Sequence, residues 1–111
     1  MLDWREREAR NQSVFRELNE WIRDENETRF GADRRLDRYL CECGDGACTC
    51  SISLTGHEYE TVRTSPTMFA IAINHENPES DHVVSENPRF ATIETCFGEA
   101  RLIALASNPR S

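Results

Sequence analysis

Hydrophobic positions along residues 3–28 recur at alternating steps of four and three residues, which is the period of an α-helix. The same stretch is dense in Arg and Glu, and pairs four residues apart, such as Glu6 and Arg10, support a helix. The apolar stripe consists of Trp4, Phe15, Leu18 and Ile22, is widened by Val14 and Trp21, and has Glu8 and Asn11 at its remaining positions. We therefore predict one long N-terminal helix.

This helix could serve in two ways. An amphipathic helix ordinarily packs its apolar stripe on its own domain. Glu8 and Asn11, however, make the first half too polar for a deep core, so the helix could instead protrude and either dimerise or dock on a partner. Both roles stay open on the sequence alone. Gly31 is the expected helix stop, and residues 29–40 are predicted as a connector with a short second helix.

The second part of the chain has short elements separated by turn residues. Residues 51–54 alternate between polar and apolar side chains, which predicts a strand. Thr55 and Glu58 have the spacing of a capping box, so we expect a helix that ends near Thr64, where a proline two residues later stops it. Further strands are predicted at residues 68–73, 82–85 and 89–96, the last two joined by a hairpin turn, with a final helix at residues 99–106.

The chain carries a net charge of −7, and this charge is unevenly distributed. Residues 1–40 hold ten acids and nine bases, a net −1, whereas residues 41–111 hold ten acids and four bases, a net −6. Binding to nucleic acid or to anionic lipid requires a basic surface, so the balance argues against both. No run reaches the ~18 apolar residues of a membrane span, and the N-terminus is charged from Asp3. We expect a soluble, cytoplasmic protein.

Four of the five cysteines lie within ten residues, in the spacing C-x-C-x4-C-x-C. In a protein that is not exported, structural disulfides are disfavoured and such a cluster indicates metal or redox chemistry. Thiolates are soft ligands that bind Zn²⁺ within a tetrahedral group. Two glycines let the loop fold back, so that Cys43 and Cys48 face one point. We predict a structural zinc site in which Cys41, Cys43 and Cys48 are three of the ligands.

The fourth ligand has two candidates. Cys50 is nearest in sequence, but it begins the following strand. His75 closes the strand of residues 68–73, and a remote ligand there would tie the cysteine loop to the rest of the fold. Glu76 could then accept a hydrogen bond from the bound imidazole. The other residues of interest are expected to be structural: His57 and His82 at the surface, and Cys96 as a small apolar group.

The C-x-C-x4-C spacing is also that of the post-SET zinc motif, but that resemblance covers only residues 41–48. The chain is too short to contain a SET domain, so methyltransferase activity is not implied. A longer resemblance covers most of the chain. The sequence resembles a family of small, uncharacterised actinobacterial proteins, with N-x3-F-R-x2-N-E-x-I, then C-x-C-x4-C, then L-T-x2-E-Y-E-x-V-R-x2-P-x2-F and a strand ending at H-E. The matching residues are Asn11, Phe15, Arg16, Asn19, Glu20, Ile22, Cys41, Cys43, Cys48, Leu54, Thr55, Glu58, Tyr59, Glu60, Val62, Arg63, Pro66, Phe69, His75 and Glu76, with Gly98-Glu99-Ala100 and Pro109-Arg110-Ser111 near the end.

This resemblance implies that His75 is the fourth ligand, because the family pattern has this histidine and usually lacks the cysteine at position 50. The thirteen bases of the chain are all Arg, which fits a high-GC actinobacterial source. The chain departs from the pattern by adding Cys50, His57 and Cys96. It also has Asn74 where the family tends to have glycine before the histidine.

These features predict an α+β fold, with an N-terminal helix and connector over residues 1–38 and a zinc-clipped domain over residues 39–111 that has a mainly antiparallel sheet and short helices. The favoured function is a regulatory or protein-interaction module with a structural zinc. Its partner would be another protein, contacted through the N-terminal helix, and a homodimer is one form of this. A thiol-based redox or metal-responsive switch, with Cys50 as the spare thiol, is the alternative. An enzyme is the third hypothesis and is disfavoured, because three thiolates and an imidazole leave the metal no open position.

Overall fold

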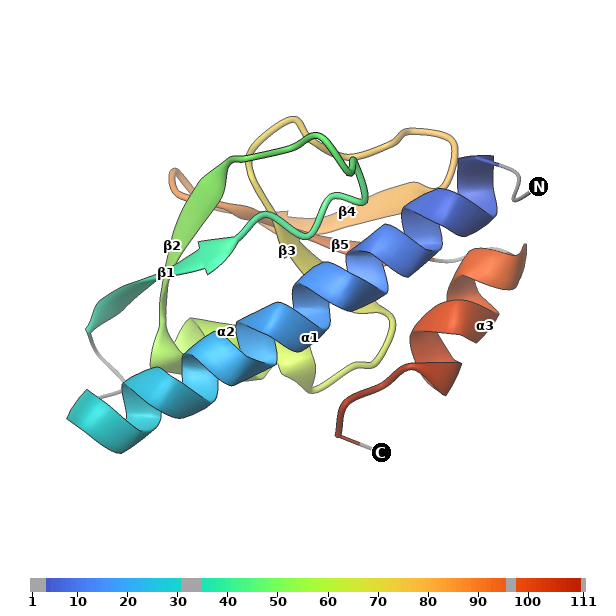
Figure 1. Cartoon of the computed structure of the whole chain (residues 1–111). Helices are drawn as coiled ribbons and strands as arrows, with labels where there is room; N and C mark the ends of the chain where they lie inside the picture. The colour runs from blue at the N-terminus through green and yellow to red at the C-terminus, as the bar shows by residue number, and fades with distance from the viewer. Residues whose placement is uncertain (1–3, 31–34, 96–97, 111) are drawn as a thin grey trace.

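The computed structural model of the chain describes residues 4–30, 35–95 and 98–110 and has an α+β fold. The elements in chain order are α1 (Trp4–Phe30), β1 (Leu36–Leu40), β2 (Ser51–Thr55), α2 (Gly56–Arg63), β3 (Met68–Ile71), β4 (Asp81–Glu86), β5 (Ala91–Thr95) and α3 (Gly98–Ala106). This is the predicted architecture of a leading helix, antiparallel sheets and short helices (Figure 1). Within these ranges no helix combines the length and the apolar character needed to cross a membrane. The predicted stop at Gly31, and Cys96, lie outside the described residues.

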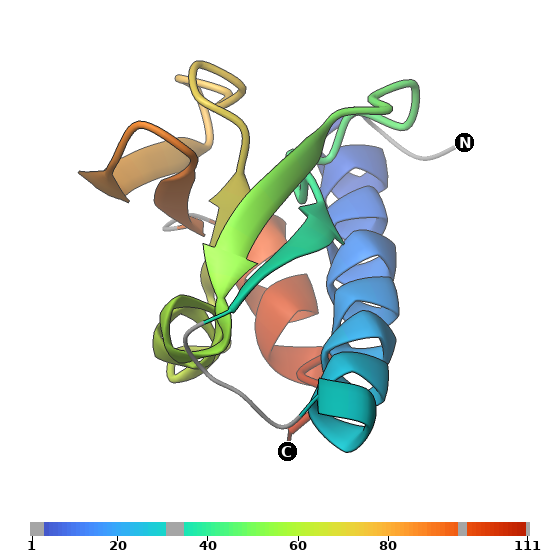
Figure 2. The ribbon, with the colours of Figure 1, turned by 90° about the vertical axis from the view of Figure 1, so that its left-hand side faces the viewer.

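The strands form two separate antiparallel sheets. β1 pairs with β2, so that Tyr39 lies opposite Ile52, and β5 lies between β3 and β4 in the second sheet. Figure 2 shows α1 along one side of the molecule, the β1–β2 pair next to it and the three-stranded sheet farther away. Just beyond β1, the backbone N–H of Glu42 donates to the carbonyl of Ala70 in β3 (2.9 Å). This hydrogen bond joins the two sheets next to the cysteine loop.

β1 corrects the prediction of a connector with a short helix over residues 29–40. Residues 36–40 pair along their whole length with residues 51–55. The strand buries Asp37 and Tyr39, whereas Leu36 is exposed, so its buried face does not follow the apolar pattern of its own residues. The strand depends on its pairing with β2, which the local sequence does not reveal.

α2 begins as the sequence predicts. The backbone N–H of Glu58 donates to the Thr55 hydroxyl (3.1 Å), and the Thr55 N–H donates to the Glu58 carboxylate (2.8 Å), which is a complete capping box. The helix buries Tyr59, whose ring stacks on Tyr39 of β1 with the ring centroids 4.6 Å apart. Aromatic stacking of this kind adds to the area that the two rings bury. The pair anchors α2 to the two-stranded sheet.

α1 packs on the body through a face that differs from the predicted apolar stripe. Of that stripe, Ile22 does pack against the core, but Trp4 and Leu18 are 39% and 40% exposed. Trp21, which was expected to widen the stripe, is 66% exposed. The buried residues of α1 are mostly polar: Ala9, Gln12, Arg16, Asn19 and Arg23. The helix therefore turns a polar face inward and part of its apolar face to solvent.

Buried polar side chains of α1 meet backbone groups of β1, α3 and the loop before β3 that need a partner. Arg16 donates to the carbonyls of Pro66 and Ala104 (2.5 and 2.9 Å). The Asn19 amide donates to the carbonyl of Leu40 and accepts from its N–H (2.9 and 2.8 Å). Because a buried polar group without a partner is costly, these contacts fix the rotation of the helix about its axis.

Candidate metal centre

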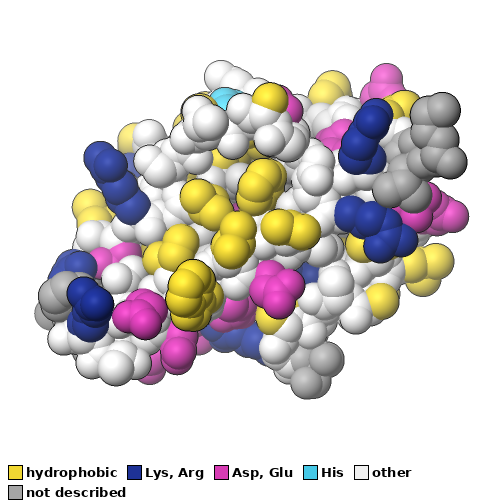
Figure 3. Space-filling view, viewed as in Figure 1, with side chains coloured by type: hydrophobic (Ala, Val, Ile, Leu, Met, Phe, Trp, Pro, Cys, Tyr) yellow, Lys and Arg dark blue, Asp and Glu magenta, His cyan; other side chains and the backbone are white. Residues whose placement is uncertain are grey.

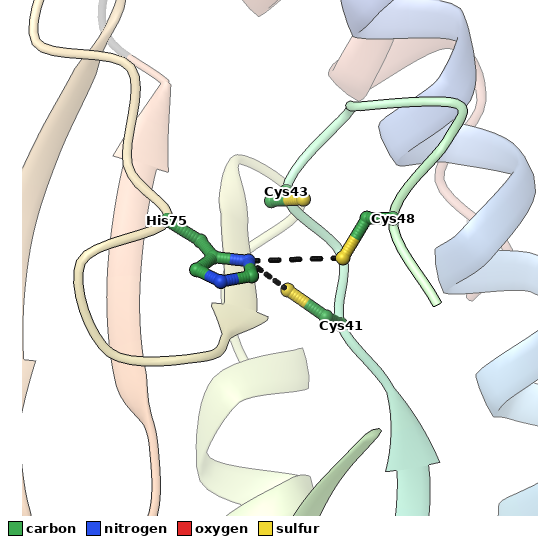
Figure 4. A group of neighbouring side chains, drawn as sticks. All are labelled: Cys41, Cys43, Cys48 and His75. Atoms are coloured by element: carbon green, nitrogen blue, oxygen red, sulfur yellow. Dashed lines mark hydrogen bonds between the residues drawn. The ribbon is translucent and has the colours of Figure 1, made fainter. Parts of the chain in front are cut away.

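Three cysteines and one histidine converge at one end of the β1–β2 pair. The ligand atoms of Cys41, Cys43, Cys48 and His75 all lie within 4.8 Å of one another, and Figure 4 shows their side chains pointing toward a common centre. It is the only such group of His, Cys, Asp or Glu side chains among the described residues. The four residues that the sequence analysis selected are thus brought together, in an arrangement suited to a metal ion.

The loop that follows β1 positions the three cysteines. Cys41 continues the strand by one residue, since its backbone N–H donates to the carbonyl of Cys50 (3.2 Å). Its Sγ accepts a hydrogen bond from the backbone N–H of Ala72 (3.1 Å). The loop then turns back at Asp45, whose carbonyl accepts from the N–H of Cys48 (3.0 Å). Cys48 is thereby returned to the side of the loop on which Cys41 lies.

Gly44 lets this loop pass close to α1. Its φ of +83° is a left-handed conformation that residues with a side chain rarely adopt. A Cβ at this position would lie 2.5 Å from the Cγ of Glu8 and 2.9 Å from the Glu8 carbonyl oxygen. The contact is held by the amide of Asn11, which donates to the carbonyl of Gly44 (2.9 Å). Asn11 is therefore used to seat the cysteine loop and not to fill an apolar stripe.

His75 reaches the group from a tight turn after β3. The backbone N–H of His75 donates to the carbonyl of Ala72 (3.1 Å), and Asn74 within this turn has φ +67°. Asn is one of the few residues besides Gly that tolerate this region. The turn thus accommodates an asparagine at a position with positive φ.

The distances from His75 to two of the sulfurs fit a tetrahedral ion. His75 Nδ1 lies 3.5 Å from Cys41 Sγ and 3.7 Å from Cys48 Sγ. Zinc–sulfur bonds of about 2.3 Å and zinc–nitrogen bonds of about 2.1 Å, at tetrahedral angles, place sulfur and nitrogen about 3.6 Å apart. Since Nδ1 faces both sulfurs, it is the imidazole atom that would bind the ion.

The pKa values of the three thiols depend on one another and on burial. The thiol of Cys41 donates a hydrogen bond to Cys43, and this lowers the pKa of Cys43 to about 5 while it raises the pKa of Cys41 well above its ordinary value. Burial raises the pKa of Cys48. Without a cation, neighbouring thiolates repel one another, so the three thiols do not all ionise. A divalent ion at their centre reverses this, because it stabilises every thiolate that it binds.

Glu42 lies between the first two cysteines and was not identified from the sequence. Its side chain is fully buried, and its carboxylate accepts hydrogen bonds from the Asn19 amide (2.7 Å) and the backbone N–H of Ala70 (2.9 Å). The residue that separates Cys41 from Cys43 is therefore fixed to α1 and β3. A carboxylate in a cysteine loop is ordinarily solvated, so the sequence alone gave no reason to select it.

The remaining candidates lie outside the group. Cys50 is exposed, and its thiol does not belong to the set of converging ligand atoms. His57 and His82 are exposed, as predicted from their sequence positions. Glu76 buries its Oε1 without a hydrogen-bond partner, so this oxygen does not accept from the imidazole. Support of His75 by Glu76 thus stays a prediction.

No protein-family model, curated protein or solved structure matches the chain. The fold and the site therefore define the molecule by themselves: a small α+β protein with a Cys₃His group suited to a metal ion.

Proposed function

We propose that this protein is a zinc-stabilised protein-interaction module in which the zinc is structural. The observation that carries the proposal is the convergence of three cysteine sulfurs and the Nδ1 of His75 within 4.8 Å of one another. The exposed apolar residues of α1 support the interaction role, because a helix face of this kind is commonly a contact surface. A regulatory task is part of the same proposal.

Zinc is the metal that this donor set favours. Thiolate and imidazole are the usual ligands of Zn²⁺, whereas Ca²⁺ and Mg²⁺ prefer oxygen, and iron–sulfur clusters are most often held by cysteines alone. Three thiolates and one imidazole complete a four-coordinate shell, which is the form of structural zinc sites. A catalytic zinc keeps a position open for water or substrate, so we assign no catalytic role to the centre.

The ion would stabilise the fold by joining segments that are far apart in sequence. Three ligands lie in the loop between β1 and β2, and the fourth follows β3 in the other sheet. Because the unfolded chain has no preformed site, the free energy of metal binding adds to the free energy of folding. The small core of a chain of 111 residues benefits from such a clip.

The experiment is zinc content per chain, measured by elemental mass spectrometry on protein purified under reducing, chelator-free conditions. We expect one zinc per chain in the wild type and in Cys50→Ser, the matched control. His75→Ala and Cys48→Ser should each lose zinc or bind it weakly. Metal-free wild type would overturn the proposal and favour a redox role for the thiols. Equal zinc retention in His75→Ala would refute the assignment of the fourth ligand.

A further inference from the structure

The outer side of α1 carries apolar residues that the described part of the chain leaves substantially uncovered. Val14 is 52% exposed, Leu18 40% and Trp21 66%. Figure 3 shows hydrophobic side chains gathered at the centre of the face that α1 crosses in Figure 1. The opposite side of the same helix is buried and mostly polar, so folding of the chain does not account for this apolar surface. A contiguous patch of this kind on a small protein marks an interaction site.

The patch is part of a stripe with a heptad-like spacing. Steps of four and three residues connect six positions, which is the pattern of the contact seam between two paired helices. These positions are Arg7, Asn11, Val14, Leu18, Trp21 and Glu25. The stripe is apolar at its centre, with a base near one end and an acid at the other.

The exposed charged residues beside the stripe also separate into a basic end and an acidic end. The N-terminal part of α1 exposes three bases, which are Arg5, Arg7 and Arg10, whereas Glu6 and Glu8 are half-buried. The C-terminal part exposes one base, Arg29, and four acids, which are Glu17, Asp24, Glu25 and Glu27. The helix surface thus runs from basic through apolar to acidic, and such a surface is complementary to itself when it is reversed.

We propose that α1 pairs with α1 of a second copy of this chain, antiparallel and about a two-fold axis. The pairing places Val14 against Leu18 of the second copy, and Arg7 against its Glu25. Asn11, whose amide stays bonded to Gly44 of its own chain, then lies at the edge of the contact beside Trp21 of the second copy, and the two-fold axis repeats each contact. A parallel pairing would set base against base and acid against acid, so the charge pattern selects the antiparallel form.

The surface is accessible for this contact. α1 lies on one side of the molecule along its length (Figures 1 and 2). The six positions extend over about 27 Å of helix at a rise of about 1.5 Å per residue. Beside Trp21, a surface pocket of about 360 Å³ that Ile22 and Asn26 also line offers room for a side chain of the second copy.

This inference rests on the proposed function, since it names the partner of the interaction module. The first test is sedimentation-velocity ultracentrifugation of the zinc-loaded full chain over about 1–100 µM. We expect a dimer. Leu18→Glu should raise the dimer dissociation constant about 100-fold or more, because each dimer then buries two charges at the centre of the contact. Leu102→Glu, the same substitution at a more exposed leucine on α3 (65% against 40%), is the control and should stay dimeric.

Charge reversal tests the direction of the pairing. Arg7→Glu and Glu25→Arg should each weaken the dimer about tenfold, because each sets like charges against each other twice. The double variant exchanges the two charges and should recover dimerisation, which a contact with any other surface does not predict. Failure of the double variant to recover would overturn the antiparallel pairing.

Zinc content, measured on the same samples, separates this proposal from the one on which it rests. A zinc-loaded wild type that stays monomeric at 100 µM would overturn the proposed pairing of two copies. A different protein would then be the partner of this face. A dimer that contains no zinc would overturn the metal proposal and leave the helix pairing intact. Circular dichroism of Leu18→Glu should match the wild type, since this residue is 40% exposed and belongs to neither hydrophobic core cluster of the described residues.

Discussion

Glu42 and Arg63 form an ion pair in the interior of the protein, with Oε1 and Nη2 2.5 Å apart and side chains 0% and 2% exposed. The same carboxylate accepts hydrogen bonds from Asn19 of α1 and from the backbone of β3. One acidic side chain, placed between two cysteines of the metal centre, therefore connects the loop to α1, α2 and β3. The pair matters less for its own attraction than for the groups that would lose their partners without it.

We expect Glu42→Gln to destabilise the fold by about 3 kcal/mol, because it leaves the buried Arg63 guanidinium without a counter-charge. Urea unfolding of the zinc-loaded protein at pH 7 measures this. Glu79→Gln is the control: its pairing with Arg5 is exposed on both sides, and exposed ion pairs contribute less than about 1 kcal/mol. Equal effects of the two substitutions would show that the buried network does not determine stability.

Gly44→Ala should destabilise the protein more than Gly98→Ala does. Both glycines have positive φ, +83° and +56°, so both substitutions incur a backbone cost of about 1–2 kcal/mol. At Gly98 the added Cβ meets nothing within 4 Å, whereas at Gly44 it lies 2.5 Å from a side-chain atom of Glu8 and 2.9 Å from its backbone oxygen. Thermal unfolding of the two variants separates the steric effect from the backbone effect. Gly44→Ala should also lower zinc affinity, since the cysteine loop must move away from α1.

The structural features that could be predicted from the sequence are mainly local ones. The capping box, the strand after the cysteine loop and the cysteine spacing involve neighbours within a few residues, and physical rules for such neighbours apply without knowledge of the fold. β1 and the buried role of Glu42 depend on partners far along the chain, so no local pattern reveals them. His75 was selected partly through a family resemblance, although it lies 27 residues from Cys48.

The hydrophobic pattern did not predict which face of α1 is buried, for a related reason. A hydrophobic stripe predicts which side of a helix is buried only when apolar burial decides the packing. Here Arg16 and Asn19 have backbone partners on other elements, and these hydrogen bonds set the orientation instead.

Arg110 gives a prediction about pH. It donates to the carboxylates of Glu20 and Glu60 at 2.7–3.0 Å, and its hydrogen bond to Glu60 lowers the pKa of that carboxyl below 4.5. A carboxyl with a lowered folded-state pKa stabilises the fold above its unfolded pKa, and this contribution is lost as the pH falls through the folded value. Arg110→Gln should therefore reduce stability at pH 7, by less than about 1 kcal/mol because the groups are partly exposed.

The pH dependence of that difference is the informative measurement. The gap between wild type and Arg110→Gln in urea unfolding should be constant from pH 7 to pH 5 and should close below pH 4.5, as Glu60 becomes protonated. Comparison of the two proteins at each pH cancels the loss of metal that acid causes in both. A gap that persists at low pH would mean that Arg110 acts through packing and not through charge.

Substitutions of Asn74 test whether the turn before His75 sets the geometry of the metal centre. Its φ of +67° is open to glycine but strained for a β-branched residue, so Asn74→Gly should bind zinc as the wild type does. Asn74→Val should weaken zinc binding about tenfold or more, because a backbone cost of about 1–3 kcal/mol is relieved when the turn opens and His75 moves away. Competition with a chromogenic chelator measures both affinities. Equal affinities in the two variants would show that His75 reaches the cysteines without this turn.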